Sequence, residues 1–226
     1  MESFVRRLKY YGTGFGLGLV FVFFFFRNRG CTWTPSNRVK NTILSRMIVV
    51  SDETQAKMDE KGITKKDIVQ VLNDGNIDFD ASDKSRKNKK YLIEKDGVKY
   101  VFTLPYESCI SEAFISNSVK KVSGTKEGKG AFIHFPNDKN LVFTDSTSFL
   151  ACQQDQLGVI GDRQIWRKIQ KNGVLDFEKT NLKTGSKPEH YIEFVWDKDT
   201  IGTKIVWYKE KLNITSFHSD YLEPCK

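Results

Sequence analysis

Apolar side chains are most concentrated near the N-terminus, where residues 10–26 carry no charge and end in four phenylalanines. A helix of these seventeen residues would reach roughly 25 Å, which is the short end of what a membrane span needs. Aromatic side chains on both flanks suit a membrane interface. We therefore expect a membrane anchor over residues 1–30, a juxtamembrane connector over residues 31–50, and contact of residues 10–26 with membrane lipid.

The same segment leaves alternatives open. A basic start followed by an apolar run is also typical of a cleaved signal peptide, but residues 24–29 are bulky or charged and offer no small-residue cleavage site. Cys31 raises a lipoprotein alternative, yet the residues before it lack the apolar positions of a lipidation signal. Gly12 and Gly16 have the spacing that lets two membrane helices approach closely, which allows a homodimer.

Basic residues flank both ends of the apolar stretch. The larger number follows it, which favours a cytoplasmic globular part. Three basic residues in the short N-terminal tail, Arg6, Arg7 and Lys9, resist translocation and pull the other way. The sequence thus predicts a single-pass protein of a bacterial inner membrane, with a slight preference for a cytoplasmic globular part.

Beyond the connector, the spacing of apolar positions predicts a first α+β unit over residues 51–117. Ser51 or Asp52 caps one helix, and Thr64 caps a second helix that ends at Gly75. Strand-like runs follow at residues 91–94, 99–104 and 109–115. An Asp-Gly pair between the first two runs is a hairpin signal, so the unit reads as two helices and an antiparallel meander.

A second unit, over residues 160–226, repeats the first. GVLDFE at residues 173–178 resembles GNIDFD at residues 75–80, with a helix before it and three strand-like runs after it. Residues 118–159 between the units read as a linker and a β insert. The expected fold class is α+β: an N-terminal transmembrane helix followed by two related helix-plus-antiparallel-meander units, the second of which lacks one helix.

The net charge of the 226-residue chain, +8, lies almost wholly in its first part. Residues 1–46 carry a net charge of +7, which leaves a net charge of only +1 for residues 47–226. A nearly neutral domain lacks the positive field that binds phosphate backbones, whereas basic residues beside an apolar helix attract anionic lipid. A nucleic-acid partner is therefore not expected.

Residues 51–77 resemble the start of an uncharacterised bacterial family, domain of unknown function 4258. Met58, Leu72 and the Gly62-Ile63 pair fit the family pattern of a short helix, a turn, a second helix and a strand meander. The short membrane helix in front is similar to hypothetical proteins of the Bacteroidetes. The resemblance implies a small α+β fold whose layout is similar to ribonuclease-type toxins. Many members have a histidine where this chain has Glu53.

The residue patterns identify no catalytic, cofactor or metal site. Three histidines, His134, His190 and His218, each stand alone without a second histidine at metal-ligand spacing. A lone histidine in a strand is most often a surface or satisfied core residue. The cysteines form neither a C-x-x-C pair nor a regular framework, and they stand at positions 31, 109, 152 and 225. No cofactor and no metal are expected.

Two further features have both a structural and a functional interpretation. The repeated Asp78-Phe79 and Asp176-Phe177 pairs could form a symmetric carboxylate site, but a local turn bond and an anchoring ring explain them more cheaply. The basic cluster at residues 84–90 could touch phosphate, but a solvated loop is the simpler interpretation. We therefore favour a membrane-tethered interaction or sensing module without a catalytic site, with an unidentified protein partner. The alternative is a degenerate ribonuclease-like domain.

Overall fold

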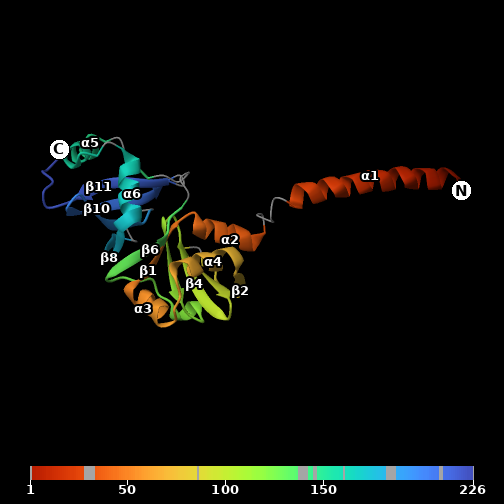
Figure 1. Ribbon diagram of the computed structural model, residues 1–226, viewed down its shortest axis with the longest axis horizontal. Helices are drawn as coiled ribbons and strands as arrows, with labels where there is room; N and C mark the ends of the chain where they lie inside the picture. The colour runs from red at the N-terminus through yellow and green to blue at the C-terminus, as the bar shows by residue number, and fades with distance from the viewer. Residues whose placement is uncertain are drawn as a thin grey trace. The chain divides into compact units, whose positions relative to one another are not determined.

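The computed structural model describes residues 2–27, 34–85, 87–136, 142–144, 147–159, 161–181, 187–208 and 211–225. It divides into two compact units, Met1–Val39 and Lys40–Lys226. The first unit holds helix α1 (Glu2–Arg27) and the start of helix α2 (Pro35–Leu44). The second unit holds the rest of α2 and every described strand (Figure 1).

Helix α1 corrects the predicted anchor. Among the described residues, no helix combines the length and the apolar character that a bilayer crossing demands. The charge-free run of residues 10–26 includes four glycines, two tyrosines and a threonine, which contribute little apolar surface, and charged residues fill the start of α1. The predicted transmembrane helix and single-pass membrane localisation are therefore wrong. The predicted contact of residues 10–26 with membrane lipid depended on that anchor and loses its basis. The homodimer through Gly12 and Gly16 stays a prediction.

The first half of the second unit, residues 47–115, is a strand, two helices and a meander. Strand β1 (Met47–Ser51) leads into helices α3 (Asp52–Glu60) and α4 (Lys65–Asp74). Four antiparallel strands follow: β2 (Asn76–Asp83), β3 (Asn88–Lys95), β4 (Val98–Pro105) and β5 (Ile110–Ile115). Strand β5 returns beside β1 and pairs with it in parallel.

The second half, residues 142–218, has the same order of elements. Strand β7 (Val142–Thr144) precedes helices α5 (Ser148–Leu157) and α6 (Asp162–Asn172). The meander consists of β8 (Val174–Asn181), β9 (Glu189–Trp196), β10 (Asp199–Tyr208) and β11 (Lys211–His218). Its last strand, β11, pairs in parallel with β7, as β5 does with β1.

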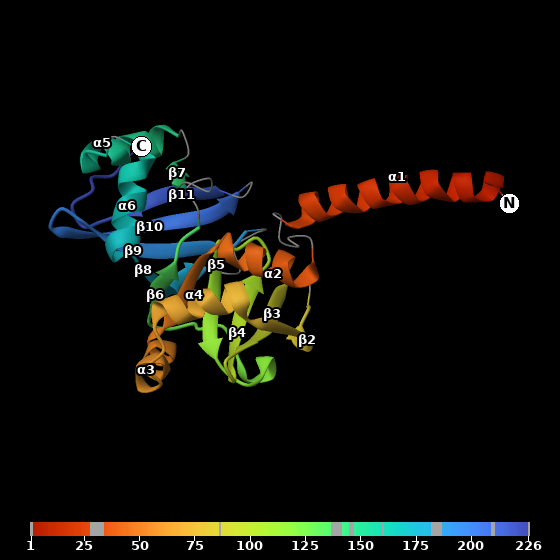
Figure 2. The same ribbon diagram turned by 45° about the vertical axis from the view of Figure 1, so that its right-hand side comes forward.

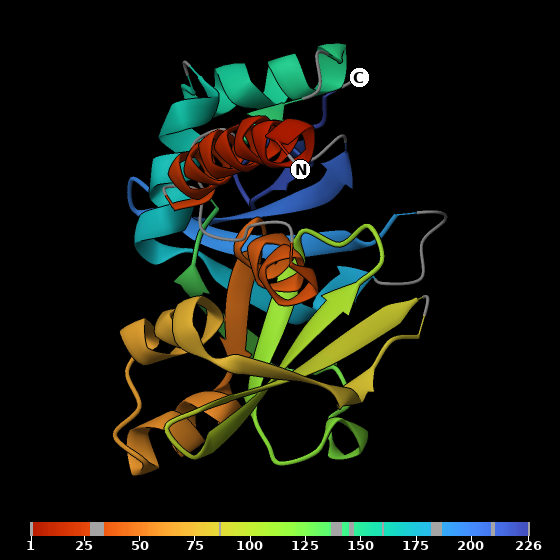
Figure 3. The same ribbon diagram turned by 90° about the vertical axis from the view of Figure 1, so that its right-hand side faces the viewer.

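Strand β6 (Lys129–His134) joins the halves by pairing antiparallel with both β1 and β8 (Figure 2). The eleven described strands therefore form one continuous sheet in the order β2-β3-β4-β5-β1-β6-β8-β9-β10-β11-β7. Figure 3 shows the blue strands of the second half above the yellow and light-green strands of the first. The predicted fold class is thus wrong: the chain is a mixed α/β fold with one large sheet rather than separate units around an insert.

Several local predictions are confirmed. The Ser51 side chain accepts a hydrogen bond from the Thr54 N–H and caps α3, and Thr64 forms a capping box with Asp67 at the start of α4. The Asp96-Gly97 turn joins β3 and β4, and both of its residues have positive φ, as a tight hairpin requires.

Strand β1 and helix α5 are the elements that the sequence patterns missed. All five residues of β1 are buried and the first four are apolar, so the strand lacks the alternation that marks a half-buried strand. Helix α5 has no strongly apolar face in its sequence, SFLACQQDQL. Its presence shows that the second half does not lack the first helix of its counterpart.

One large hydrophobic core connects strands of both halves. Met47 and Val49 of β1 pack in the same cluster as Ile165, Trp166 and Ile169 of α6. Helix α6 contacts β9 and β7, so it covers the second half of the sheet. Residues of both halves therefore share one core.

Candidate ligand-binding cavity

A cavity of about 330 Å³ lies between the two halves. The first half contributes Asn88 of β3, Ser108 before β5 and Glu112 of β5. The second half contributes Leu175 and Phe177 of β8 and His190 of β9. We call this space the central cavity; most of its lining residues have polar side chains, but its exposed surface is more apolar than polar, as in small-molecule sites.

Glu112 is the acidic side chain buried in this cavity. Only 5% of it is exposed, and its carboxylate accepts hydrogen bonds from the Thr125 N–H at 3.1 Å and from the Thr125 hydroxyl. Burial raises the pKa of Glu112 to about 7, although the two bonds from Thr125 act in the opposite direction. Near neutral pH the side chain is therefore present in both its neutral and its charged form.

His190 lies across the cavity and is almost completely buried. Its Nε2 is 2.9 Å from the Ser108 hydroxyl oxygen, whereas its Nδ1 has no hydrogen-bond partner among the described residues. Burial lowers the pKa of His190 to about 3, with a further contribution from the positive charge of Arg46. The imidazole is therefore neutral at physiological pH.

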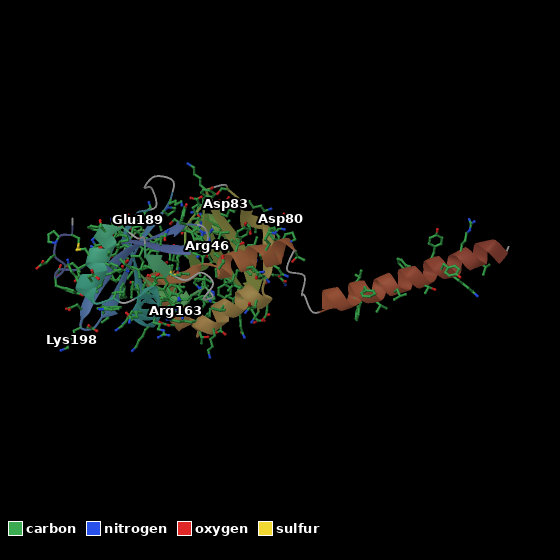
Figure 4. The ribbon with its side chains drawn as sticks, turned by 90° about the horizontal axis from the view of Figure 1, so that it is seen from above. Arg46, Asp80, Asp83, Arg163, Glu189 and Lys198 are labelled. Carbon is green, nitrogen blue, oxygen red and sulfur yellow. A yellow bond between two sulfur atoms is a disulfide. The ribbon has the colours of Figure 1, made fainter. Side chains whose placement is uncertain are left out.

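Arg46, labelled in Figure 4, is the cationic group whose charge acts on His190. Its Nη1 donates to the Pro105 carbonyl oxygen at 2.7 Å, which holds the guanidinium in place. Burial lowers the pKa of Arg46 to about 10 and raises the pKa of the nearby Cys109 thiol to about 12. Cys109 is therefore a neutral, fully buried thiol rather than a reactive thiolate.

The hydroxyl groups of the cavity wall are already used in internal hydrogen bonds. Ser108 Oγ lies 3.0 Å from both the N–H and the carbonyl oxygen of Ile110. Thr103 Oγ1 accepts from the Glu112 N–H at 3.0 Å, and Thr180 Oγ1 donates to the Asp176 carbonyl at 2.6 Å. The buried side-chain polar atoms of the lining that have no partner in the described part of the chain are Asn88 Oδ1 and His190 Nδ1.

A second hollow, which we call the outer cleft, lies on the second half and measures about 600 Å³. Lys179 Nζ sits 4.8 Å from the centre of the Tyr191 ring, and the Tyr191 and His218 rings are 5.7 Å apart. Glu193 pairs with Lys179 at 2.8 Å and with Lys129 at 2.6 Å. The cleft therefore gathers basic, acidic and aromatic groups, and its lysine, Lys179, is paired with Glu193.

A disulfide between Cys152 of α5 and Cys225 ties the C-terminal segment beside the outer cleft (Figure 4). Gln156 holds the same segment, because its side chain accepts from the Glu223 N–H at 2.8 Å and donates to the Glu223 carbonyl at 3.3 Å. The sequence did not indicate this pairing. Cys31 lies outside the described residues.

The other candidate residues have structural roles. His134 Nε2 bonds the Leu44 carbonyl oxygen at 2.9 Å, and Glu53 forms an exposed pair with Lys57. From the basic cluster, Lys90 donates to the Val122 carbonyl at 2.7 Å. No group of three or more metal-ligating side chains occurs in the described ranges. Sequence reasoning missed Glu112, whose one signal was a carboxylate inside the apolar run of residues 109–115.

The chain matches no protein-family model, no curated protein and no solved structure. Its resemblance to domain of unknown function 4258 therefore stays a prediction.

Proposed function

We propose that the second unit is a sensing module that binds a small molecule in the central cavity. One observation carries this proposal: the cavity is lined by side chains from both halves and contains a buried, titratable carboxyl group, Glu112. Buried polar groups with perturbed pKa values are concentrated at functional sites. Its volume of about 330 Å³ falls within the range of small-ligand pockets.

The position of the cavity gives a mechanism for sensing. A ligand in it contacts β5 of the first half and β8 of the second at once, and these two strands are connected in the sheet only through β1 and β6. Ligand binding then stabilises the arrangement in which the halves face each other, by an amount that grows with ligand concentration. A partner protein that contacts both halves would detect this change.

A screen of thermal stability with a library of small molecules tests the proposal. Gly124 lines the cavity, and a Cβ at this position would meet only the Glu112 Oε2 atom, at 3.9 Å. Gly124→Leu should therefore fill the cavity with little strain. Gly161→Leu is the matched control, because a Cβ there meets nothing within 4 Å and lies outside the cavity.

We expect some compounds to raise the melting temperature of the native chain and of Gly161→Leu but not that of Gly124→Leu. A ligand at one hundred times its dissociation constant stabilises by about 2.7 kcal/mol, which is easily measured. The proposal fails if no compound stabilises the native chain, or if every active compound stabilises Gly124→Leu equally.

One observation favours a second candidate function, a ribonuclease-like activity. The outer cleft brings together an exposed histidine, a tyrosine and a lysine, namely His218, Tyr191 and Lys179. Groups of these types can perform acid/base chemistry on RNA and stabilise its phosphate. Glu193 opposes this function, because it occupies both neighbouring lysines.

Incubation with labelled RNA tests the second candidate directly. If the cleft cleaves RNA, His218→Ala should abolish cleavage and Tyr191→Phe should reduce it, whereas His134→Ala should leave it unchanged because His134 lies outside the cleft. Intact RNA after incubation with the native chain would dismiss this candidate.

A further inference from the structure

We propose that the ligand of the central cavity is a small organic amine, bound as its cation with the ammonium group at Glu112. This inference rests on the proposed function, since it names the ligand class of the same site. Three features of the cavity support it: the hydrogen-bonding groups that it leaves free, its charge, and its walls.

The buried polar atoms that the described lining leaves without a partner are Asn88 Oδ1 and His190 Nδ1, and both can be acceptors. Ser108 has one hydroxyl proton, and with that proton on the Ile110 carbonyl its oxygen accepts from His190 Nε2. The neutral imidazole then has Nδ1 as an acceptor. Nδ1 and Asn88 Oδ1 are covered acceptors on lining residues, and the Glu112 carboxylate is an acceptor that bonds Thr125. An ammonium group carries three donors and no acceptor, so it matches this set.

The charge of the cavity also favours a cationic ligand. Neither bond to the Glu112 carboxylate comes from a cation, and burial without a counter-charge raises its pKa. Lys126 and Glu178, the other charged residues of the lining, are exposed to solvent. A ligand cation would supply the missing charge and turn a buried, uncompensated carboxylate into half of an ion pair.

Arg46 does not line the cavity, but its positive charge acts on His190, which does, and so it disfavours a cation at that wall. Its guanidinium is held at the Pro105 carbonyl. The ammonium group is therefore expected at Glu112, and the apolar stem of the ligand against Leu175 and Phe177, which are both buried and line the cavity. A stem the size of a benzyl group suits a cavity of about 330 Å³.

Binding of an amine should depend on pH in one direction. The ion pair needs the charged form of Glu112, whose pKa is about 7, whereas a simple alkylamine keeps its proton until about pH 10. Affinity should therefore rise about tenfold between pH 6 and pH 8 and then stay level. His190, Cys109 and Arg46 do not titrate in this interval, because their pKa values are about 3, 12 and 10.

Calorimetric titration of the full chain with three benzyl compounds tests the proposal: benzylamine, benzyl alcohol and benzoate share one skeleton and differ in charge. We expect benzylamine to bind, with about tenfold higher affinity at pH 8 than at pH 6. Glu112→Gln should weaken it by at least about tenfold and remove the pH dependence. Glu60→Gln, an exposed carboxylate of α3 that does not line the cavity, should leave both unchanged.

The outcomes separate this proposal from the proposed function. Binding of benzyl alcohol or benzoate in preference to benzylamine overturns the ligand class but leaves a sensing cavity. Binding of none of the three also overturns the amine proposal, while the library screen with Gly124→Leu decides independently whether the cavity binds ligands. The pH dependence of the native chain keeps the test valid even if Glu112→Gln folds poorly.

Discussion

Strands β2 and β8 show the same sequence motif in two different settings. In both, the aspartate accepts backbone hydrogen bonds from residues just after it: Asp78 from Asp80 and Ala81, and Asp176 from Lys179. Four residues on, the hydroxyls of Ser82 and Thr180 donate to the carbonyl of the same aspartate and accept an N–H from the neighbouring strand. The pairing register shifts at this point in both strands.

The two settings differ in burial. Strand β2 is at the edge of the sheet and Asp78 is exposed, whereas β8 lies between β6 and β9 and Asp176 is 7% exposed. Local sequence therefore determines the turn bonds, while the neighbouring strand determines how much they contribute to stability. The structural interpretation of the Asp-Phe pairs is confirmed for the turn bond, and neither aspartate lines the central cavity.

The largest expected effect distinguishes the two phenylalanines of the motif. Phe177 is 8% exposed and belongs to the main core, whereas Phe79 is only partly buried and packs edge-on against Tyr91. Phe177→Ala should lower the free energy of unfolding by about 3–5 kcal/mol and Phe79→Ala by about 1 kcal/mol, measured by chemical denaturation. Equal losses would show that the edge strand is as tightly packed as the interior one.

The disulfide gives a second difference between the halves. Cys152 and Cys225 are 73 residues apart, so opening the bond should cost about 2–4 kcal/mol by releasing the unfolded chain. In the double variant Cys152→Ser and Cys225→Ser, hydrogen exchange should accelerate in α5 and in the C-terminal segment more than in β3 and β4. Uniform acceleration over both halves would contradict a local role, and Cys109→Ala is the control that keeps the disulfide.

The cavity residues from the two halves should respond to pH in opposite senses. Because the pKa of Glu112 is raised to about 7, the folded chain keeps a proton between pH 4.5 and 7 that the unfolded chain has lost, so stability falls as pH rises. Because the pKa of His190 is lowered to about 3, the unfolded chain holds the extra proton between pH 3 and 6.5, so stability falls as pH falls.

The free energy of unfolding of Glu112→Gln, relative to that of the native chain, should therefore rise by about 2–3 kcal/mol when the pH is raised from about 4.5 to about 8. The free energy of unfolding of His190→Gln, relative to that of the native chain, should rise as the pH is lowered from 6.5. Urea titrations at a series of pH values measure both effects. If the difference in free energy of unfolding between the native chain and a variant does not change with pH, the residue concerned does not titrate as proposed.

The smallest expected effect concerns the aspartates themselves. Asp176→Ala removes a buried carboxylate and leaves the part-buried Lys179 N–H without its acceptor, which should cost about 1–2 kcal/mol. Asp78→Ala removes similar bonds in contact with water and should cost less than about 1 kcal/mol. A larger loss for Asp78→Ala, in the same denaturation assay, would reverse the proposed role of burial.

Elements with strong local signals were predictable from the sequence. The capping box of Thr64 and Asp67, the Asp96-Gly97 hairpin and the apolar face of α6 all depend on residues within a few positions of each other. Strands β1 and β7 were not recognised as members of the halves, because their partners β5 and β11 lie roughly sixty to seventy residues away. Periodicity carries no information on such pairings.

The candidate site was even less predictable. In the sequence His190 is a lone histidine in a strand, and only the packing of the two halves brings it to the same cavity as Glu112. The sequence shows a carboxylate in an apolar run, but not which wall will cover it. The disulfide likewise depends on the return of the C-terminal segment to α5.

The continuity of the sheet also decides where another chain could add a strand. Among the described strands, only β2 and β7 have a free edge. Strand β2 carries acidic side chains along its length, including Asp80 and Asp83, and β7 is three residues long. Charged and very short edge strands resist pairing with other copies. Joining two halves through β6 thus removes two internal edges and leaves only two that discourage aggregation.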